Sequence, residues 1–174
     1  MCIEGVRMNE KNGSVIILNG ISSSGKSTLA KELQSCLGNN YLHCQIDSFL
    51  KMLPNNPSLK EFPKLMAAFN QTVKVLSKTN HNVIVDVVLR GINGYSDIKN
   101  ELQDIKLLIV KVDCPLEELK KRELKRGNRE IGLSEKQYND IVHDGIPYDI
   151  EVNSFKNTPL ECAEKIYEYI EKNT

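Results

Sequence analysis

Residues 20–27 read Gly20-Ile21-Ser22-Ser23-Ser24-Gly25-Lys26-Ser27. This stretch matches the phosphate-binding pattern G-x-x-x-x-G-K-[ST] in full. The preceding residues 14–19 are apolar and β-branched, which predicts a strand buried on both faces. The following residues 26–37 repeat leucine every four positions, which predicts a helix. A strand, a glycine-rich turn and a helix in this order direct backbone N–H groups and the positive end of the helix dipole at an anion.

The motif gives each of its key positions an expected role. Gly20 and Gly25 are expected to adopt backbone angles that a side chain would forbid. Lys26 is expected to reach the β- and γ-phosphates of a nucleotide, and the Ser27 hydroxyl is expected to bind Mg²⁺. Average residue usage produces a chance match in about one chain in two hundred of this length. The sequence therefore predicts nucleotide binding.

Short apolar runs alternate with helical patterns along the whole chain. Strands are expected at residues 14–19, 41–46, 82–89, 105–113 and 150–152. Helices are expected at residues 26–37, 47–53, 59–77, 95–103 and 115–126, with a loop at 54–57. This order predicts an α/β fold, a three-layer sandwich with a five-stranded parallel sheet and helices on both faces. Ligands of such sheets bind beyond the carboxyl ends of the strands.

Two further helices are predicted from capping boxes, in which a hydroxyl residue is followed three positions later by Glu or Gln. One box is Ser134 with Gln137, and the other is Thr158 with Glu161. The core-facing residues expected in the last helix are Leu160, Ala163, Ile166 and Ile170.

Length and composition indicate one ordinary globular domain. We expect residues 1–13 to be a loose extension and residues 14–174 to form a single P-loop kinase domain. Lysine and arginine total 23 and aspartate and glutamate total 23, a balance that argues against a nucleic-acid partner. The balance hides two opposite regions. Residues 120–129 hold six basic residues and one acid, and residues 140–172 hold eight acids and three basic residues.

Cysteine and histidine spacing predicts no metal centre. The five cysteines form no C-x-x-C pair, so reduced thiols are expected. His43 and His81 are expected to be structural, and His143 is expected to lie at the end of a helix. The sequence lacks a signal-peptide core and an apolar run of about 20 residues. We therefore expect a cytoplasmic protein without a membrane partner.

The phosphate motif leaves the reaction open, and other motifs narrow it. The N-K-x-D and D-x-x-G motifs of GTPases are absent, and Asp86 is followed by Val87 instead of the second acid typical of motor ATPases. The remaining class is the small kinase, which needs a base near the acceptor hydroxyl, cations around the phosphoryl group and a lid.

Two carboxylates follow expected strands at the carboxyl edge of the sheet. Asp47 is a candidate general base, although it is an equally good candidate for the N-cap of a helix beginning at Ser48. Asp86 is a candidate Mg²⁺ ligand through water, and the alternative is an ion pair with a neighbouring basic residue.

The basic segment 120–129 is a candidate lid. Arg122 and Arg126 are four positions apart and share one helix face, and Arg129 follows Gly127. Guanidinium groups suit phosphate oxygens and stack on adenine. The alternative is a solvated helix face, which we accept for the lysines of this segment.

Four segments resemble the chloramphenicol phosphotransferase-like proteins, which are P-loop kinases that phosphorylate a hydroxyl of the antibiotic. The segments are residues 16–27, 46–48, 122–129 and 143–152, and the resemblance spans residues 14–170. It implies that Asp47 is the catalytic base and that Lys26, Ser27 and the lid arginines handle ATP and Mg²⁺. This chain departs from the family at Val87, where a second acid is frequent, and at Arg90, where a small residue is usual.

The sequence thus predicts an ATP-dependent small-molecule O-phosphotransferase, with a chloramphenicol-like alcohol among the candidate acceptors. The alternatives are a nucleotide-binding regulatory protein and a nucleic-acid end kinase, and the low aromatic content of 6% speaks against the latter. The predicted catalytic residues are Asp47, Lys26 and Arg129. The predicted ATP-binding residues are Gly20, Ser22, Ser23, Ser24, Gly25, Lys26, Ser27, Thr28, Arg122 and Arg126. The predicted Mg²⁺ residues are Ser27 and Asp86.

Overall fold

A computed structural model describes residues 12–38, 40–53, 61–127, 131–140 and 142–173. Within these ranges, five strands form one parallel sheet in the order β2-β3-β1-β4-β5. The strands are β1 (Val15–Asn19), β2 (Tyr41–Gln45), β3 (Asn82–Val87), β4 (Leu107–Asp113) and β5 (Ile150–Asn153). The predicted α/β fold with a five-stranded parallel sheet is confirmed.

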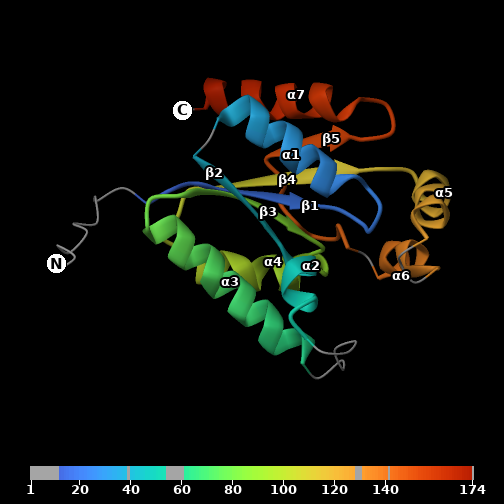
Figure 1. Cartoon of the computed structure of the whole chain (residues 1–174), viewed down its shortest axis with the longest axis horizontal. Coiled ribbons are helices and arrows are strands. Elements are labelled where there is room, and N and C mark those ends of the chain that lie inside the picture. The colour runs from blue at the N-terminus through green and yellow to red at the C-terminus, as the bar shows by residue number, and fades with distance from the viewer. Residues whose placement is uncertain (1–11, 39, 54–60, 128–130, 141, 174) are drawn as a thin grey trace, which may run out of the picture.

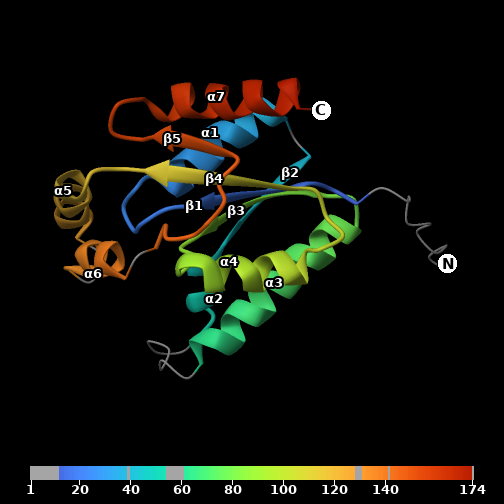
Figure 2. The ribbon, with the colours of Figure 1, turned by 180° about the vertical axis from the view of Figure 1, so that it is seen from behind.

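Helices cover both faces of the sheet (Figures 1 and 2). On one face lie α1 (Lys26–Leu37) and α7 (Pro159–Lys172), and on the other lie α3 (Phe62–Lys78) and α4 (Gly91–Glu101). The short helix α2 (Ile46–Leu50) follows β2 directly. Beyond the carboxyl end of β4 lie α5 (Leu116–Arg126) and α6 (Leu133–Asn139) (Figure 1). The three layers leave the carboxyl ends of the strands facing α2, α5 and α6.

The central strand β1 explains why the first apolar run has no polar side. It pairs with β3 on one edge and β4 on the other, so neither of its edges is exposed. Its alternate residues Val15 and Ile17 join the core beneath α3 and α4, while Ile16 and Leu18 join the core beneath α1 and α7. Burial on both faces makes β1 a rigid base for the turn that follows it.

The predicted start of α4 is wrong. The helix begins at Gly91, four residues before the predicted Tyr95, because tertiary contacts outweigh the low helix propensity of glycine. The N–H of Gly91 donates to the carbonyl oxygen of Val142 at 3.3 Å, and Gly94 packs closely against Leu89. This early start brings Arg90 and the first turn of α4 to the carboxyl edge of the sheet.

One of the two predicted capping boxes is confirmed. Thr158 and Glu161 cap each other at the start of α7. The box at Ser134 and Gln137 is wrong, since α6 begins at Leu133 and neither side chain caps it. Both side chains bond to other elements instead.

The predicted inward face of α7 is also shifted. Leu160 is 48% exposed, and Cys162 lies in the core in its place, while Ala163 and Ile166 are fully buried as expected.

None of the helices in the described ranges combines the length and the apolar character that a membrane span requires.

Three sequence expectations fall wholly or partly outside the described ranges. They concern most of the N-terminal extension, the loop at 54–57, and Arg129. Gly13, the last residue of the expected extension, is buried, and its N–H donates to the carbonyl oxygen of Ser77 at 2.9 Å.

Candidate functional site

The turn between β1 and α1 forms a tightly curled anion cradle. Ser23 and Gly25 have positive φ angles of 69° and 90°, which curl the backbone around its own N–H groups. Gly20 is required for a different reason from the expected one. Its φ angle is not positive, but an added Cβ would lie 2.6 Å from the carbonyl oxygen of Val112 in β4.

Three hydroxyl groups of this cradle have unused hydrogen-bonding capacity. The Oγ atoms of Ser22, Ser23 and Ser24 are buried and have no hydrogen-bond partner in the described part of the chain. Buried polar groups are nearly always paired, so unpaired ones call for a ligand. Ser22 and Ser23 also line the cavity next to the cradle, where phosphate oxygens would accept hydrogen bonds from their hydroxyls, which makes the cradle suited to a nucleotide.

Lys26, Ser27 and Asp86 meet at the floor of the cradle. The Lys26 side chain is buried, and its Nζ donates to the carbonyl oxygens of Gly20 at 2.8 Å and Ile21 at 3.1 Å. The same Nζ lies 3.9 Å from Oδ1 of Asp86. Ser27 Oγ donates to Asp86 Oδ2 at 2.5 Å. The structure thus brings the adjacent motif residues Lys26 and Ser27 together with Asp86, which lies 59 positions after Ser27.

Asp86 is a buried carboxylate that its surroundings keep ionised. Burial raises its pKa, but the His43 imidazole, the Lys26 ammonium and the Ser27 hydroxyl together hold the pKa below its usual value. His43 Nε2 lies 3.8 Å from Asp86 Oδ2. The ion pair with Lys26, expected as an alternative to metal binding, is therefore present, and it leaves the Asp86 carboxylate charged.

The oxygen atoms of Ser27 and Asp86 suit Mg²⁺. Hydroxyl and carboxylate oxygens are hard ligands, and Mg²⁺ is usually held by one or two protein groups together with water and phosphate oxygens. In the described ranges, no cluster of three or more His, Cys, Asp or Glu residues forms a larger metal site. A magnesium ion shared with a nucleotide fits this donor set.

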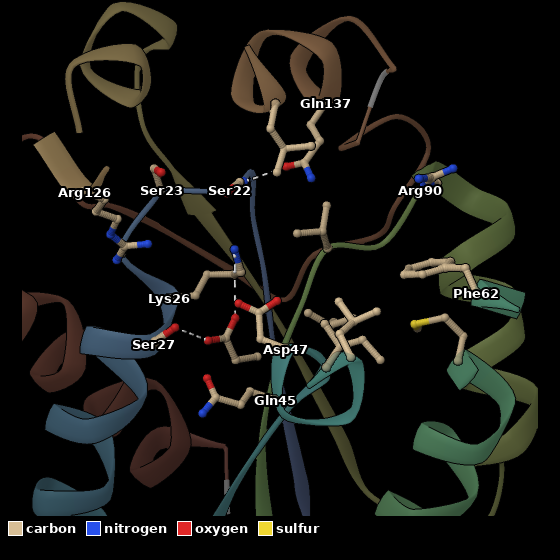
Figure 3. A pocket seen from close by; sticks show the side chains of 18 residues that line it. Ser22, Ser23, Lys26, Ser27, Gln45, Asp47, Phe62, Arg90, Arg126 and Gln137 are labelled. Carbon is tan, nitrogen blue, oxygen red and sulfur yellow. Dashed lines mark hydrogen bonds and ion pairs between the residues drawn. The ribbon is translucent and has the colours of Figure 1, made fainter. Parts of the chain in front are cut away.

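Asp47 lies in the first turn of α2 and faces the same cavity. The helix begins at Ile46 with Gln45 as its N-cap, so the alternative reading of Asp47 as an N-cap is wrong. The Phe49 ring packs edge-on against the buried Phe69 ring with 5.2 Å between centroids, which fixes α2 on α3. Asp47, Lys26, Ser27 and Asp86 line one cavity of about 230 Å³. In Figure 3 the Asp47 carboxylate points toward Lys26.

The two described lid arginines differ in their bonding. Arg122 is committed to structural contacts, since its Nε donates to Glu118 at 2.8 Å and its NH groups donate to Ser154 at 3.0 and 3.2 Å. It thereby ties α5 to the segment after β5. Arg126 lies one turn further on and is exposed, and it makes no ion pair within the described ranges.

A second cavity lies beside the cradle. It measures about 490 Å³, and its wall includes Thr28 of α1, Arg122 and Arg126 of α5, and Pro159 of α7. Arg126 also lines the first cavity, so it stands between the two. The predicted positions Thr28, Arg122 and Arg126 therefore border the cradle, whereas Arg129 is outside the described residues.

The sequence reading missed Glu123, which fixes the start of α6. The Glu123 side chain is buried, and its carboxylate accepts hydrogen bonds from the N–H of Gly132 at 3.0 Å and from the N–H and Oγ of Ser134 at 3.0 and 3.1 Å. Its spacing in the sequence could have indicated burial. Glu123 is the one acid of segment 120–129, and it lies four positions after Leu119, on the same face of the helix.

Gln137 is the second missed residue. Its Oε1 accepts a 2.7 Å hydrogen bond from the backbone N–H of Ser22, so α6 is bonded directly to the cradle (Figure 3). No sequence pattern pointed to this contact, since the residues are 115 positions apart.

Asn19, the residue before the cradle, begins a chain of hydrogen-bonded side chains that continues through Tyr148 to His143. The Asn19 Oδ1 accepts from the N–H of Leu89 at 2.8 Å, which directs Asn19 Nδ2 to donate to Tyr148 Oη at 2.6 Å. The Tyr148 hydroxyl and Nδ1 of His143 lie 2.6 Å apart and share a hydrogen bond. Burial lowers the pKa of His143, while burial raises the pKa of Tyr148 to about 12.

The model of the family described as chloramphenicol phosphotransferase-like protein matches residues 13–171. The chain belongs to this family. The match covers every strand and nearly all of α7, and it confirms the resemblance seen in the sequence. This match establishes a kinase-like P-loop phosphotransferase family for residues 13–171.

Several proteins similar to this chain are named kinases. The adenylyl-sulfate kinase of Clostridium acetobutylicum is 25% identical over 181 residues, which cover 96% of this chain and 88% of that protein. The APS kinase of Mycobacterium tuberculosis, solved in complex with AMPPNP and APS, has a TM-score of 0.71 at 21% identity, covering 92% of this chain and 99% of its own. The gluconokinase of Sinorhizobium meliloti has a TM-score of 0.67 at 14% identity and covers 94% of each chain. These structures share the fold.

Proposed function

We propose that this member of the chloramphenicol phosphotransferase-like family is an ATP-dependent O-phosphotransferase, which moves the γ-phosphoryl group to a hydroxyl of a small molecule. The observation that carries the proposal is one shared cavity, in which Asp47 of α2 faces Lys26, Ser27 and Asp86 at the anion cradle. A regulatory nucleotide-binding protein would need the cradle but not a carboxylate in this position.

ATP is the proposed phosphoryl donor. Its phosphates would occupy the cradle, where Ser22, Ser23 and Ser24 carry unpaired hydroxyls in the described structure. Its base would lie in the neighbouring cavity, beside Arg126. The AMPPNP complex of the APS kinase with the same fold is consistent with this choice of nucleotide.

Ser27 and Asp86 would hold Mg²⁺ with the β- and γ-phosphates. The ion, when bound, neutralises charge on the phosphate oxygens during transfer. The lowered pKa of Asp86 keeps its carboxylate ionised at neutral pH, although burial works against this. Lys26 adds a second positive charge next to the same oxygens.

Asp47 is the proposed general base. The acceptor oxygen forms a bond to the γ-phosphorus while the bond from that phosphorus to the bridging oxygen of ADP breaks, and ADP leaves with the bonding electrons. The proton of the acceptor hydroxyl passes to the Asp47 carboxylate. Such a base contributes a factor of about 10²–10⁴ to the rate.

The acceptor would occupy the side of the cavity away from the cradle. Ile46, Leu50, Phe62 and Met66 make that side apolar, which suits an organic alcohol. Chloramphenicol is the acceptor that the family name suggests, and it is one compound in the test below.

The proposal is tested by mass spectrometry of candidate alcohols, chloramphenicol included, after incubation with the protein, ATP and Mg²⁺. A phosphorylated product formed together with stoichiometric ADP is expected for at least one alcohol. The Lys26→Ala variant serves as the control and should form no product. ATP binding without transfer to any alcohol of the panel would contradict the proposal and favour a regulatory role.

A further inference from the structure

Arg90 occupies the acceptor side of the cavity. It lies between β3 and α4. Its Cζ lies over the Phe62 ring of α3, 5.5 Å from the centroid. In Figure 3, Arg90 and Phe62 lie across the cavity from Ser23 and Lys26. The stacking contact holds a guanidinium group at the far wall from the cradle.

In the described part of the chain, the Arg90 guanidinium contacts an aromatic ring rather than an acid. No ion pair among the described residues involves it, whereas Lys74 pairs with Glu101 at 2.9 Å and Arg122 pairs with Glu118 at 2.8 Å. The guanidinium group is planar, and a cation–π contact with the Phe62 ring leaves its N–H groups able to donate to another partner. That plane matches a carboxylate, phosphate or sulfate group in a two-pronged contact.

Two acids line the same cavity as Arg90, and their negative charge affects which acceptors can bind. Asp47 and Asp86 both line the cavity, so an anionic acceptor would be repelled unless a positive charge compensates. Lys26 and Arg126 lie toward the cradle, where the phosphates of ATP would take up their charge. Arg90 is then the cation on the acceptor side of the cavity that can pair with an anionic acceptor.

A groove extends the site beyond Arg90 and Phe62. It measures about 650 Å³ and lies between α3 and α4, and Phe62, Met66, Val88 and Arg90 line both it and the main cavity. Asn70 of α3 lines the groove, is 6% exposed, and has an Oδ1 without a hydrogen-bond partner in the described ranges. A ligand entering past Arg90 would find both room and a hydrogen-bond acceptor there.

We propose that the acceptor is an anionic alcohol, whose carboxylate, phosphate or sulfate group pairs with Arg90 while its hydroxyl faces Asp47. The remainder of the molecule extends into the groove between α3 and α4. This inference rests on the proposed function for the role of the hydroxyl, but its binding component is measurable without transfer.

Calorimetry of the protein loaded with AMPPNP and Mg²⁺ tests the inference, because AMPPNP occupies the cradle and blocks anion binding there. The probes are three pairs that differ mainly in charge: glycerol 3-phosphate and glycerol, gluconate and glucose, and AMP and adenosine. In at least one pair the anion should bind about 30-fold or more tightly than its neutral partner, the strength expected of a charge-assisted hydrogen-bonded contact.

The Arg90→Ala variant should lose this preference, and Arg90→Lys should recover part of it, because the lysine keeps the charge without the planar fork. The matched control is Lys99→Ala in α4, the helix that begins directly after Arg90. It removes another cation in contact with an aromatic ring, since Lys99 Nζ lies 5.3 Å from the Tyr95 centroid, and Lys99 lines neither cavity. It should keep the preference. Unfolding curves of all three variants exclude a loss through misfolding.

Equal affinity within every pair, including a lack of binding by any probe, overturns the inference, and so does a preference that survives in Arg90→Ala. The transfer assay separates this outcome from failure of the proposed function. Anion binding that depends on Arg90 without phosphorylation of any alcohol would sustain the inference about the ligand and contradict the proposed reaction. Phosphorylation of neutral alcohols as efficiently as of their anionic partners would sustain the proposed reaction and contradict the inference about an anionic ligand.

Discussion

Ser27 Oγ and Asp86 Oδ2 lie 2.5 Å apart, so the first turn of α1 is bonded to the end of β3 at the floor of the cradle. This contact joins the phosphate motif to a carboxylate that lies 59 positions away in the sequence. It also places two hard oxygen ligands side by side where the metal of a nucleotide would bind.

The Asp86→Asn variant should bind Mg²⁺ more weakly than the wild-type protein. Loss of one carboxylate ligand should lower kcat/KM by about 10- to 100-fold and raise the Mg²⁺ concentration for half-maximal rate. The measurement is the rate of ADP release against Mg²⁺ concentration. The control is Asp104→Asn, the same change at an exposed carboxylate. An unchanged Mg²⁺ dependence in Asp86→Asn would remove Asp86 from the metal site.

Arg126 should contribute to ATP binding more than any other described residue of α5. It lies between the two cavities and makes no ion pair in the described structure, so its guanidinium is available to the nucleotide. Arg126→Ala should raise the Kd for ATP by about 10- to 100-fold, as expected for loss of a hydrogen bond to a charged group. Titration with a fluorescent ATP analogue measures this. Lys121→Ala, an exposed neighbour, should change the Kd little, and equal effects of the two variants would refute the assignment.

Glu123 should stabilise the fold through the start of α6. Its carboxylate accepts three hydrogen bonds, and the amide of Glu123→Gln would turn a donor toward the same N–H groups. The free energy of unfolding should fall by about 1–3 kcal/mol. Urea unfolding measures this, with Glu117→Gln as the control because the Glu117 side chain is 80% exposed. A loss in Glu123→Gln no larger than in the control would show that the buried cap contributes nothing.

His143 should make the protein less stable in mild acid. Burial lowers its pKa, so the folded protein resists protonation of this ring. The unfolded chain takes up this proton near pH ~6.5. The contribution is therefore fully present above that pH and is lost as the pH falls from it toward the lowered folded value, by at most about 1.4 kcal/mol per pH unit.

Urea unfolding between about pH 5.5 and about pH 7.5 checks this dependence. His143→Gln should flatten the slope, while His81→Gln should keep it, because His81 is exposed and bonded only locally to Thr79. A wild-type slope in His143→Gln would assign the dependence to other groups.

Sequence patterns were sufficient for the features that local chemistry determines. The phosphate motif and the β-branched runs predicted the cradle, the parallel sheet and the helix α1 with its correct ends, because these depend on residue spacing within one segment. The carboxyl ends of parallel strands share one edge, which is why Asp47 and Asp86 were both predicted near the cradle.

Features that depend on distant contacts were not predictable. Gln137 was read as part of a capping box, yet its side chain bonds Ser22, and nothing within its own segment indicates this. Glu123 was not singled out from the basic segment around it, because its role depends on hydrogen bonds from the backbone N–H groups of Gly132 and Ser134. The stacking of Arg90 on Phe62 likewise joins two segments that no local pattern connects.

The central claim is that Asp47 accepts the proton of an acceptor hydroxyl. The most direct test is single-turnover transfer of the γ-phosphoryl group to an alcohol by wild-type protein and by Asp47→Asn, with ATP affinity measured in parallel. We predict unchanged ATP affinity and a transfer rate lower by about 10²- to 10⁴-fold in Asp47→Asn. Transfer at the wild-type rate with ATP still bound would contradict the claim.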